Sequence, residues 1–266
     1  MSSPLLAVSG LTKRYRGGKT IAAVDDVSFD IEAGETLALA GPSGSGKSTI
    51  ARLVLRLIEP DAGRIEFEGG DFLSLNGAAL RARRARVQMV FQDPLAAFNP
   101  RASVGRVLDD PLRIHGIAAR SERPRRIAAL LERVGLSADL AGRAIHEISG
   151  GQRQRIAIAR AIATNPSLIV LDEAVSALDV SVRRQILQLL LDLQREQRIA
   201  YLFISHDLGV ISAIAHRVVV VDAGRVAESG NARAVIAAPQ SAIGKALVAA
   251  APKLNRAGTQ GAADRQ

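Results

Sequence analysis

One segment of the chain combines glycines, a lysine and hydroxyl side chains at a spacing that suits phosphate binding. Residues 41–49 read Gly-Pro-Ser-Gly-Ser-Gly-Lys-Ser-Thr and fit the pattern G-x-x-x-x-G-K-[ST]. A short apolar run at 35–40 precedes them, and apolar residues at helical spacing follow over 48–58. Between a strand and a helix, the backbone N–H groups of such a loop turn toward phosphate oxygens. The segment therefore predicts a nucleoside triphosphate site, and its flanks disfavour the alternative of a glycine-rich turn with an incidental Lys-Ser pair.

The side chains of this loop have distinct expected roles. Lys47 supplies a positive charge to the terminal phosphates, and Ser48 is a candidate ligand for Mg²⁺. The other expected phosphate contacts are Gly41, Ser43, Gly44, Ser45, Gly46 and Thr49.

An acidic pair follows a second apolar run. Residues 167–171 read Ser-Leu-Ile-Val-Leu, which is typical of a parallel strand buried on both faces, and Asp172 and Glu173 come next. Because the carboxyl ends of parallel strands line a common crevice, these acids can face the phosphate loop. We expect Asp172 to hold Mg²⁺ and Glu173 to polarise the water that attacks the γ-phosphate. An isolated Asp-Glu pair is more often a solvated turn, so the pair draws its significance from the loop at 41–49.

Composition excludes several other chemistries. The 266 residues are 48% hydrophobic and 23% charged, which is ordinary for a soluble globular protein. The absence of cysteine excludes disulfides, thiolate zinc sites, iron–sulfur clusters and a cysteine nucleophile. The first ten residues lack a secretory pattern, and every apolar run is shorter than the roughly 18 residues of a spanning helix. None of the four histidines forms a metal-ligand pair on one helix, so Mg²⁺ carried with the nucleotide is the only metal expected.

The net charge of +9 is concentrated in one part of the chain. Residues 81–143 contain thirteen arginines, no lysine and six acidic residues, and so carry seven of the nine net positive charges. Helical patterning over 102–115 and 122–135 predicts that this stretch is an inserted, mostly helical subdomain. By itself such a charge suits nucleic acid, an anionic membrane surface or a phosphate ligand, or is only a solvated face.

The remaining sequence predicts alternating strands and helices. The expected elements are strands within 5–32 with turns at Gly17-Gly18 and Asp25-Asp26, an amphipathic helix over 180–197, a buried strand over 200–204, and a hairpin of 218–221 and 225–228. The small, polar residues after Pro252 predict a mobile tail.

A further motif identifies a family. Ile148-Ser-Gly-Gly-Gln-Arg-Gln154 resembles the LSGGQ signature of ATP-binding cassette (ABC) ATPases. Four further residues resemble functional positions of that family, in the right order along the chain. They are Tyr15, which resembles the aromatic residue stacked on adenine; Gln92, which resembles the glutamine linking γ-phosphate and Mg²⁺ to the transport subunit; Asp179 of Ser176-Ala-Leu-Asp179, in the loop that bridges two cassettes; and His206, which resembles the switch histidine.

The resemblance implies a fold and a division of the chain. The implied fold class is α/β, a P-loop NTPase (RecA-like) core with an N-terminal antiparallel β subdomain and an inserted α-helical subdomain. The implied ATP-binding domain covers 5–238, with the helical subdomain at about 93–147. The remainder, 239–266, is expected to be a partly disordered tail.

The resemblance also implies a dimer with two composite sites. One cassette's phosphate loop holds ATP, and the partner's Ser149, Gly150, Gly151 and Gln152 close over it, as suits the start of a helix that faces an anion. The implied catalytic residues are Glu173, His206 and Gln92, and the implied Mg²⁺ ligands are Ser48, Gln92 and Asp172.

Two segments resemble one branch of the family, the ATPases of peptide and nickel importers. They are Phe91-Gln-Asp-Pro-Leu-Ala-Ala-Phe-Asn-Pro-Arg101 and Asp172-Glu-Ala-Val-Ser-Ala-Leu-Asp179. The ending at 238–247 matches that branch only loosely, and the cysteine cluster of many relatives is missing, so nickel or an opine stays open beside peptides.

This branch implies partners and a location. The expected partners are two transmembrane permease subunits, a second ABC ATPase that is a copy or a paralogue, and, indirectly, an extracytoplasmic binding protein. The expected location is peripheral, on the cytoplasmic face of the inner (plasma) membrane, where the basic stretch 81–143 includes the surface that meets the permease.

Two alternatives of different function are weighed against this one. A nucleic-acid-associated ABC ATPase suits the basic charge, but the chain has one cassette, few aromatic residues and no zinc-binding cysteines, so no nucleic acid is expected. The ATPase of an exporter or lipoprotein-release complex is disfavoured by the segment 91–101.

Overall fold

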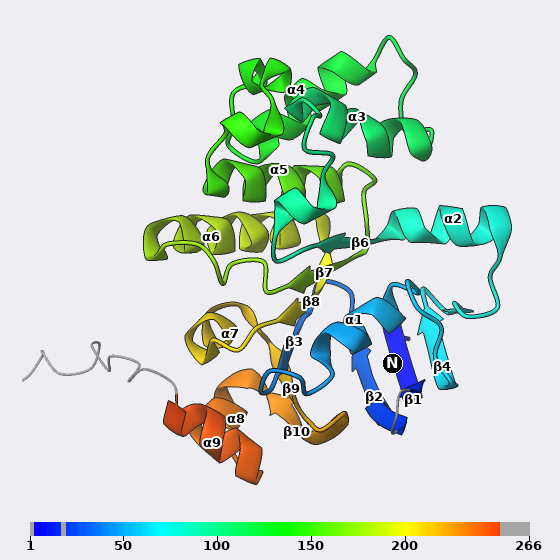
Figure 1. Ribbon diagram of the computed structural model, residues 1–266, viewed down its shortest axis with the longest axis vertical. Coiled ribbons are helices and arrows are strands. Elements are labelled where there is room, and N and C mark those ends of the chain that lie inside the picture. The colour runs from blue at the N-terminus through cyan, green and yellow to red at the C-terminus, as the bar shows by residue number, and fades with distance from the viewer. Residues whose placement is uncertain (1–2, 17–19, 251–266) are drawn as a thin grey trace, which may run out of the picture.

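Two β-sheets and a set of helices make up the described part of the chain, residues 3–16 and 20–250 of a computed structural model (Figure 1). The strands are β1 (Leu6–Arg16), β2 (Thr20–Ile31), β3 (Thr36–Ala40), β4 (Ala62–Phe67), β5 (Gly70–Asp71), β6 (Val87–Val90), β7 (Leu168–Asp172), β8 (Ala200–Ile204), β9 (Arg217–Asp222) and β10 (Arg225–Asn231). The α-helices are α1 (Lys47–Val54), α2 (Gly77–Arg86), α3 (Val104–Ile114), α4 (Arg123–Arg133), α5 (Gly150–Ile162), α6 (Val180–Gln197), α7 (Leu208–Ile214), α8 (Ala232–Ala237) and α9 (Ala242–Ala250). Short 3₁₀ turns are η1 (Pro94–Ala97), η2 (Ala138–Gly142) and η3 (Ile145–Glu147).

The central sheet has six strands in the order β10-β9-β3-β8-β7-β6, and all neighbouring pairs except β9–β10 are parallel. Its inner strands are apolar throughout because both faces are covered. In β7, Ile169 and Leu171 belong to one core, while Leu168 and Val170 belong to another. All four are fully buried, as the uninterrupted apolar run predicts.

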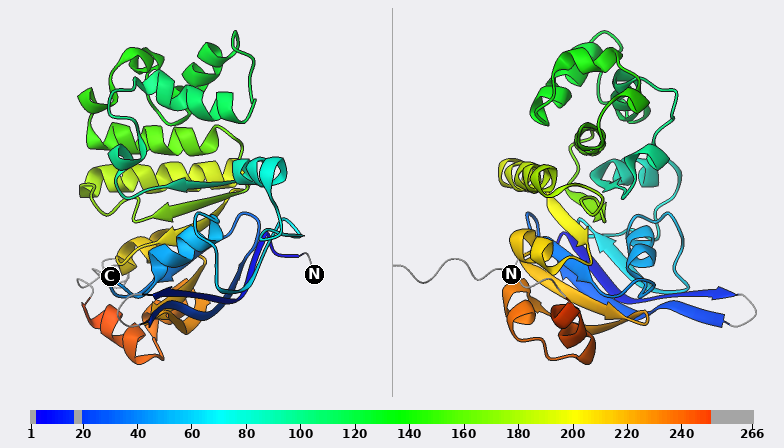
Figure 2. Two further views of the ribbon diagram at one scale, coloured as in Figure 1. Left: turned by 45° about the vertical axis from the view of Figure 1, so that its right-hand side comes forward. Right: turned by 60° about the vertical axis from the view of Figure 1, so that its left-hand side comes forward.

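The second sheet is antiparallel, with the order β2-β1-β4-β5. Its buried face shares a core with α1 and with one face of β3, β7 and β8. The α/β class and the antiparallel N-terminal β subdomain that the family resemblance implied are therefore confirmed. Figure 2 shows the green helices at one end of the molecule and α8 and α9 at the other. No helix in the described ranges is long and apolar enough to cross a membrane.

Four features differ from the sequence expectations. The turn expected at Asp25-Asp26 does not end a strand: both residues lie inside β2, where Asp26 has φ +56° at an irregularity in the pairing with β1. The helix expected over 48–58 ends at Val54, and Leu55 is its C-cap residue. The arginine-rich stretch expected to enter the helical subdomain at about 81 instead forms α2 and β6, and β6 pairs with β7 in the central sheet. The segment 239–250, expected to belong to the tail, contains α9. The Gly17-Gly18 turn and the tail beyond 250 lie outside the described residues.

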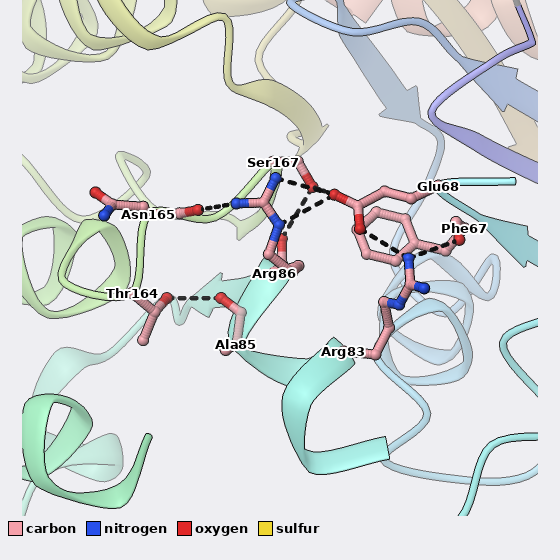
Figure 3. A network of polar contacts seen from close by, with 8 residues as sticks. All are labelled: Phe67, Glu68, Arg83, Ala85, Arg86, Thr164, Asn165 and Ser167. Atoms are coloured by element: carbon pink, nitrogen blue, oxygen red, sulfur yellow. Dashed lines mark hydrogen bonds and ion pairs between the residues drawn. The ribbon is translucent and has the colours of Figure 1, made fainter. Parts of the chain in front are cut away.

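A polar network fastens the antiparallel sheet to the central sheet (Figure 3). Its centre is the carboxylate of Glu68, which follows β4. Arg83 Nη1 lies 2.7 Å from Oε2, while Arg86 Nη2 and the Ser167 hydroxyl lie 3.0 and 2.7 Å from Oε1. Arg86 also donates to the carbonyl of Asn165. One carboxylate thus joins β4 to α2 and to the turn before β7.

The surroundings of Glu68 favour its charged form. Partial burial on its own raises the pKa of this carboxyl. The hydrogen bond from Ser167 and the charges of Arg86 and Arg83 outweigh burial and hold the pKa below its usual value of 4.5.

Glu68→Gln should lower the free energy of unfolding at pH 7 by about 1–2 kcal/mol, because three donors lose a charged acceptor. The stability difference between wild type and variant should be fully present above pH 4.5 and should disappear as the pH falls through the lower folded pKa. Urea unfolding between pH 3 and 7 measures both effects. Glu66→Gln, at an exposed neighbouring position on β4, is the control; equal effects of the two substitutions would contradict this role for Glu68.

Candidate nucleotide site

The phosphate-loop segment 41–49 comprises the connection between β3 and α1 together with the first residues of α1, and it contains the buried Lys47. The Lys47 ammonium donates to the carbonyl of Gly41 at 2.9 Å and that of Pro42 at 2.7 Å, and lies 3.3 Å from Ser45 Oγ. Burial lowers the pKa of Lys47, and the charges of Glu173 and Asp172 partly oppose that shift. Within the described chain no carboxylate oxygen lies within 4 Å of the ammonium, so an anionic ligand at the loop would be its nearest charged partner.

Two glycines let the loop fit between β2 and the β9–β10 turn. A Cβ at Gly41 would lie 2.2 Å from the Val221 carbonyl oxygen, and one at Gly46 would lie 2.4 Å from that of Ala23. Gly46 also has φ +108°, a conformation that side chains rarely adopt. The Gly224 N–H donates to the Ser45 carbonyl at 2.9 Å and closes the cradle.

The end of β7 faces this loop. The Ser48 hydroxyl donates to Asp172 Oδ1 at 3.3 Å, although 124 residues separate them. Burial raises the pKa of Asp172, and the hydrogen bond from Ser48 opposes the shift. A hydroxyl and a partly buried carboxylate side by side form an oxygen donor set of the kind that Mg²⁺ accepts, so these residues fit the expected metal.

Glu173 is the meeting point of three strand ends. Gln92, after β6, donates its side-chain N–H to Glu173 Oε2 at 3.1 Å. His206, after β8, has Nδ1 3.3 Å from Glu173 Oε1. The expected catalytic residues thus lie together, beside the Ser48–Asp172 pair.

The backbone of Glu173 is held in an unusual conformation. Its φ is +48°, in the left-handed region, which costs a non-glycine residue about 1 kcal/mol or more. The Glu173 N–H donates to the Ile204 carbonyl at 3.1 Å, and its carbonyl accepts from the Ser176 hydroxyl at 2.9 Å. These bonds fix the direction in which the carboxylate leaves the end of β7.

Ser149 and Asp179 begin two neighbouring helices, away from the phosphate loop. Ser149 caps α5, and its side chain and that of Gln152 satisfy each other's backbone N–H groups. Asp179 caps α6 through the Val182 N–H at 2.9 Å, and a Cβ at Gly151 would lie 2.8 Å from the Val182 side chain. Among the described residues no hydrogen bond or ion pair joins this cluster to 41–49, so the chain does not bring all its predicted site residues together.

Tyr15 lies on β1 at the flank of the loop. Its side chain is 44% exposed, and its cross-strand partner is Ile21. Two residues further along β2 is Ala23, whose carbonyl packs against Gly46. An exposed aromatic ring therefore stands on the strand pair that borders the loop.

The residues that contact the site residues and fix their positions were not identified by the sequence analysis. Gly224 and Ala23 position the loop, and Arg183 at the start of α6 pairs with Asp207 at 2.9 Å, next to His206. The turn at 222–224 was predicted as a turn, but a turn pattern says nothing about what the turn contacts. The only signal for Asp207 was its adjacency to His206.

Gly46→Ala should destabilise the protein by about 2 kcal/mol, because a methyl group cannot share space with the Ala23 carbonyl. Gly44→Ala is the control: Gly44 also has positive φ, but a Cβ there meets no atom within 4 Å, so only the roughly 1 kcal/mol cost of the left-handed backbone remains. Thermal unfolding without nucleotide compares the two. Equal losses would show that packing against β2 does not constrain the loop.

Comparisons with known proteins agree with this geometry. A family model described as ABC transporter matches residues 24–176. The chain is 52% identical over 257 residues to the glutathione import ATP-binding protein GsiA of Salmonella paratyphi A; the match covers 94% of this chain but only 41% of that protein. It is 50% identical over 260 residues to the probable peptide ABC transporter ATP-binding protein y4tS of Sinorhizobium fredii, covering 95% of this chain and 74% of that one.

Two solved structures of ATP-binding cassette proteins are similar to this chain. A dimeric post-hydrolysis structure of the ATP-binding cassette MJ0796, bound to ADP and Pi, superposes with a TM-score of 0.78 at 30% identity, over 86% of this chain and 99% of that one. The structure of cbiO1 from Clostridium perfringens, part of the ABC transporter complex cbiONQ, has the same TM-score at 28% identity, over 89% and 92% of the two chains. The phosphate loop, the strand-end carboxylates and these matches together show that the chain belongs to the ABC transporter family.

Proposed function

We propose that this chain is the ATP-hydrolysing subunit of an ABC importer that takes up peptides. The observation that carries the proposal is the convergence of Gln92 and His206 on the Glu173 carboxylate, beside the Ser48–Asp172 pair and Lys47. Peptide rather than nickel is the favoured substrate, since the similar proteins are described as glutathione import and peptide transport ATP-binding proteins.

The residues divide the work of hydrolysis among them. Loop N–H groups and the Lys47 ammonium bind the phosphates of ATP, with Gly41, Ser43, Gly44, Ser45, Gly46 and Thr49 in the loop. Glu173 accepts a hydrogen bond from the attacking water and orients it toward the γ-phosphate. Gln92 and His206 hold the two oxygens of that carboxylate, and both can bond to phosphate or water in its place.

Mg²⁺ would be held by Ser48, Asp172 and Gln92, and when bound it would neutralise charge on the phosphate oxygens. The Ser48 hydroxyl donates to Asp172, so these two residues lie side by side. Tyr15 would stack on adenine from the β1–β2 strand pair.

The cluster at the start of α5 and α6 is proposed to serve a second cassette. Among the described residues, no hydrogen bond or ion pair joins the start of α5 to the phosphate loop of the same chain. This start comprises Ser149, Gly150, Gly151 and Gln152, and Asp179 begins the neighbouring helix α6. A dimer in which each chain's α5 start covers the partner's ATP gives these residues a ligand. The dimeric state of the MJ0796 cassette supports this arrangement.

A groove beyond the C-terminal end of α1 is proposed to dock a permease subunit. Its volume is about 460 Å³, and it lies between the 55–57 turn, α2, β6 and the end of α3. Leu57, Ile114 and Phe91 line it and are 54%, 53% and 38% exposed, and such a group of exposed apolar side chains marks an interaction site.

The charge of the groove suits a membrane partner. Arg81, Arg84 and Arg160 line it beside the apolar residues, so an apolar segment with acidic neighbours fits it. Part of the basic charge of 81–143 therefore lies on α2, at the groove, rather than in the helical subdomain. We place the chain at the cytoplasmic face of the membrane, with two permease subunits as partners and a separate binding protein delivering substrate.

The domain assignment is part of the same proposal. The ATP-binding domain would cover 5–238, with the helical subdomain at about 93–147 containing α3 and α4. The remainder, 239–266, would be a tail that begins with α9.

Glu173→Gln should reduce the rate of ATP hydrolysis at least 100-fold, because an amide cannot accept the proton of the attacking water. ATP binding should persist, and an ATP-bound dimer should accumulate on size-exclusion chromatography. Glu66→Gln, at an exposed position on β4, should leave hydrolysis unchanged. Hydrolysis retained in the Glu173→Gln protein would refute the proposed role.

Leu57→Gln should weaken binding to the permease subunits about tenfold or more, because a buried apolar contact becomes polar. Peptide uptake into vesicles should fall in parallel, while hydrolysis by the isolated chain should stay unchanged. Leu57→Met, which keeps an apolar side chain, should retain uptake. Normal assembly and uptake with Leu57→Gln would exclude this groove as the docking surface.

A further inference from the structure

A polar cavity lies at the amino ends of the central strands, whereas the phosphate loop lies at their carboxyl ends. The loop follows the carboxyl end of β3, whereas this cavity, of about 580 Å³, is lined by Gly34 just before β3 and by His216 just before β9. The ends of α6 and α7 and the start of α8 complete its wall. Its volume is in the range of small-molecule sites.

The charged side chains that line this cavity are all cationic. They are Arg195 and Arg198 from the end of α6, and Arg233 from α8. Arg195 lies 3.5 Å from Asp192, while Arg198 and Arg233 have no carboxylate within 4 Å in the part of the chain that the structure describes. No aspartate or glutamate is among the lining residues.

Two acidic residues beside the adjoining strands, Asp30 and Glu35, are already paired. Arg217, next to His216, binds Asp30 at 2.9 Å and Glu35 at 3.3 Å. These two carboxylates are therefore held by Arg217 rather than by the arginines of the cavity. Glu32, next to Ala33 of the lining, forms no ion pair with those arginines among the described residues.

Two further side chains at the cavity, His216 and Asn231, have their acceptor atoms occupied and can offer it only hydrogen-bond donors. The Thr36 N–H donates to His216 Nδ1 at 3.0 Å, so the proton of the neutral imidazole must be on Nε2. Asn231 Oδ1 accepts from the N–H groups of Arg233 and Ala234 at 3.1 and 3.2 Å, which leaves the amide NH₂ as the free end of that side chain. Both add hydrogen-bond donors, and neither adds an acceptor.

We propose that this cavity is a binding site for a small anion of the phosphate-ester or polyphosphate class, separate from the nucleotide site. Guanidinium groups bind phosphate through paired N–H donors. The donors here come from three separate segments of the chain: the end of α6, His216 and the start of α8. A tetrahedral phosphate has more acceptor oxygens than a single planar carboxylate and can accept from several such segments at once.

Titration with inorganic pyrophosphate, followed calorimetrically without Mg²⁺, tests the proposal. The full chain carries Lys47→Ala throughout, which weakens the phosphate loop equally in every sample. One sample adds Arg198→Gln and Arg233→Gln, and the matched control adds Arg120→Gln and Arg125→Gln, two exposed arginines whose loss changes the net charge equally. We expect saturable binding that weakens at least tenfold in the cavity variant and is retained in the control.

Equal affinities in the two double variants, or no saturable binding to the Lys47→Ala chain, would overturn the proposal. Tighter binding of citrate than of pyrophosphate would overturn the phosphate class. If the glutamine variant unfolds at a lower temperature than the control, Arg198→Lys with Arg233→Lys replaces it. These lysines keep the charge without the paired donors, so the affinity should still fall, and an unchanged affinity would contradict the proposed recognition.

Discussion

The parallel arrangement of the central sheet is the constraint on which the site depends. Parallel strands need crossover connections, so their carboxyl ends all meet at one edge of the sheet. The phosphate loop follows β3, Gln92 follows β6, Asp172 ends β7 and His206 follows β8. Residues more than 100 positions apart become hydrogen-bonded neighbours by this geometry, and none of them needs to be close in sequence.

At that edge, burial and polar contacts have opposite effects on the charged forms of Lys47 and Asp172. Burial alone disfavours the charged forms of Lys47 and Asp172, and each is stabilised by polar neighbours rather than by a direct ion pair. Glu173 is held in a left-handed backbone conformation by bonds to β8 and Ser176. Its carboxylate is bound by Gln92 and His206, which come from the strands on either side of β7. Substitution of Gln92 or His206 would therefore remove a direct contact to the Glu173 carboxylate, the proposed base.

The basic charge of the chain is divided among surfaces with different surroundings. Arginines on α2 line an apolar groove, while Arg83 and Arg86 of the same helix are neutralised by Glu68. Arg198 and Arg233 stand at the amino edge of the sheet without acidic partners among the described residues. The net charge of +9 therefore does not describe one surface, and each patch has to be interpreted from its own neighbours.

The sequence alone was sufficient for the features that depend on local pattern. The loop 41–49, the apolar run before Asp172 and the helix over 180–197 are local, because glycine spacing and hydrophobic period act within a few residues. The extent of α2 and β6 was not predictable, since pairing with β7 outweighs the local arginine content. Nor were the Ala23–Gly46 contact, the meeting of Gln92 and His206 at Glu173, or the convergence of arginines at the far edge of the sheet. These depend on which distant segments pack together, and only the tertiary structure decided that.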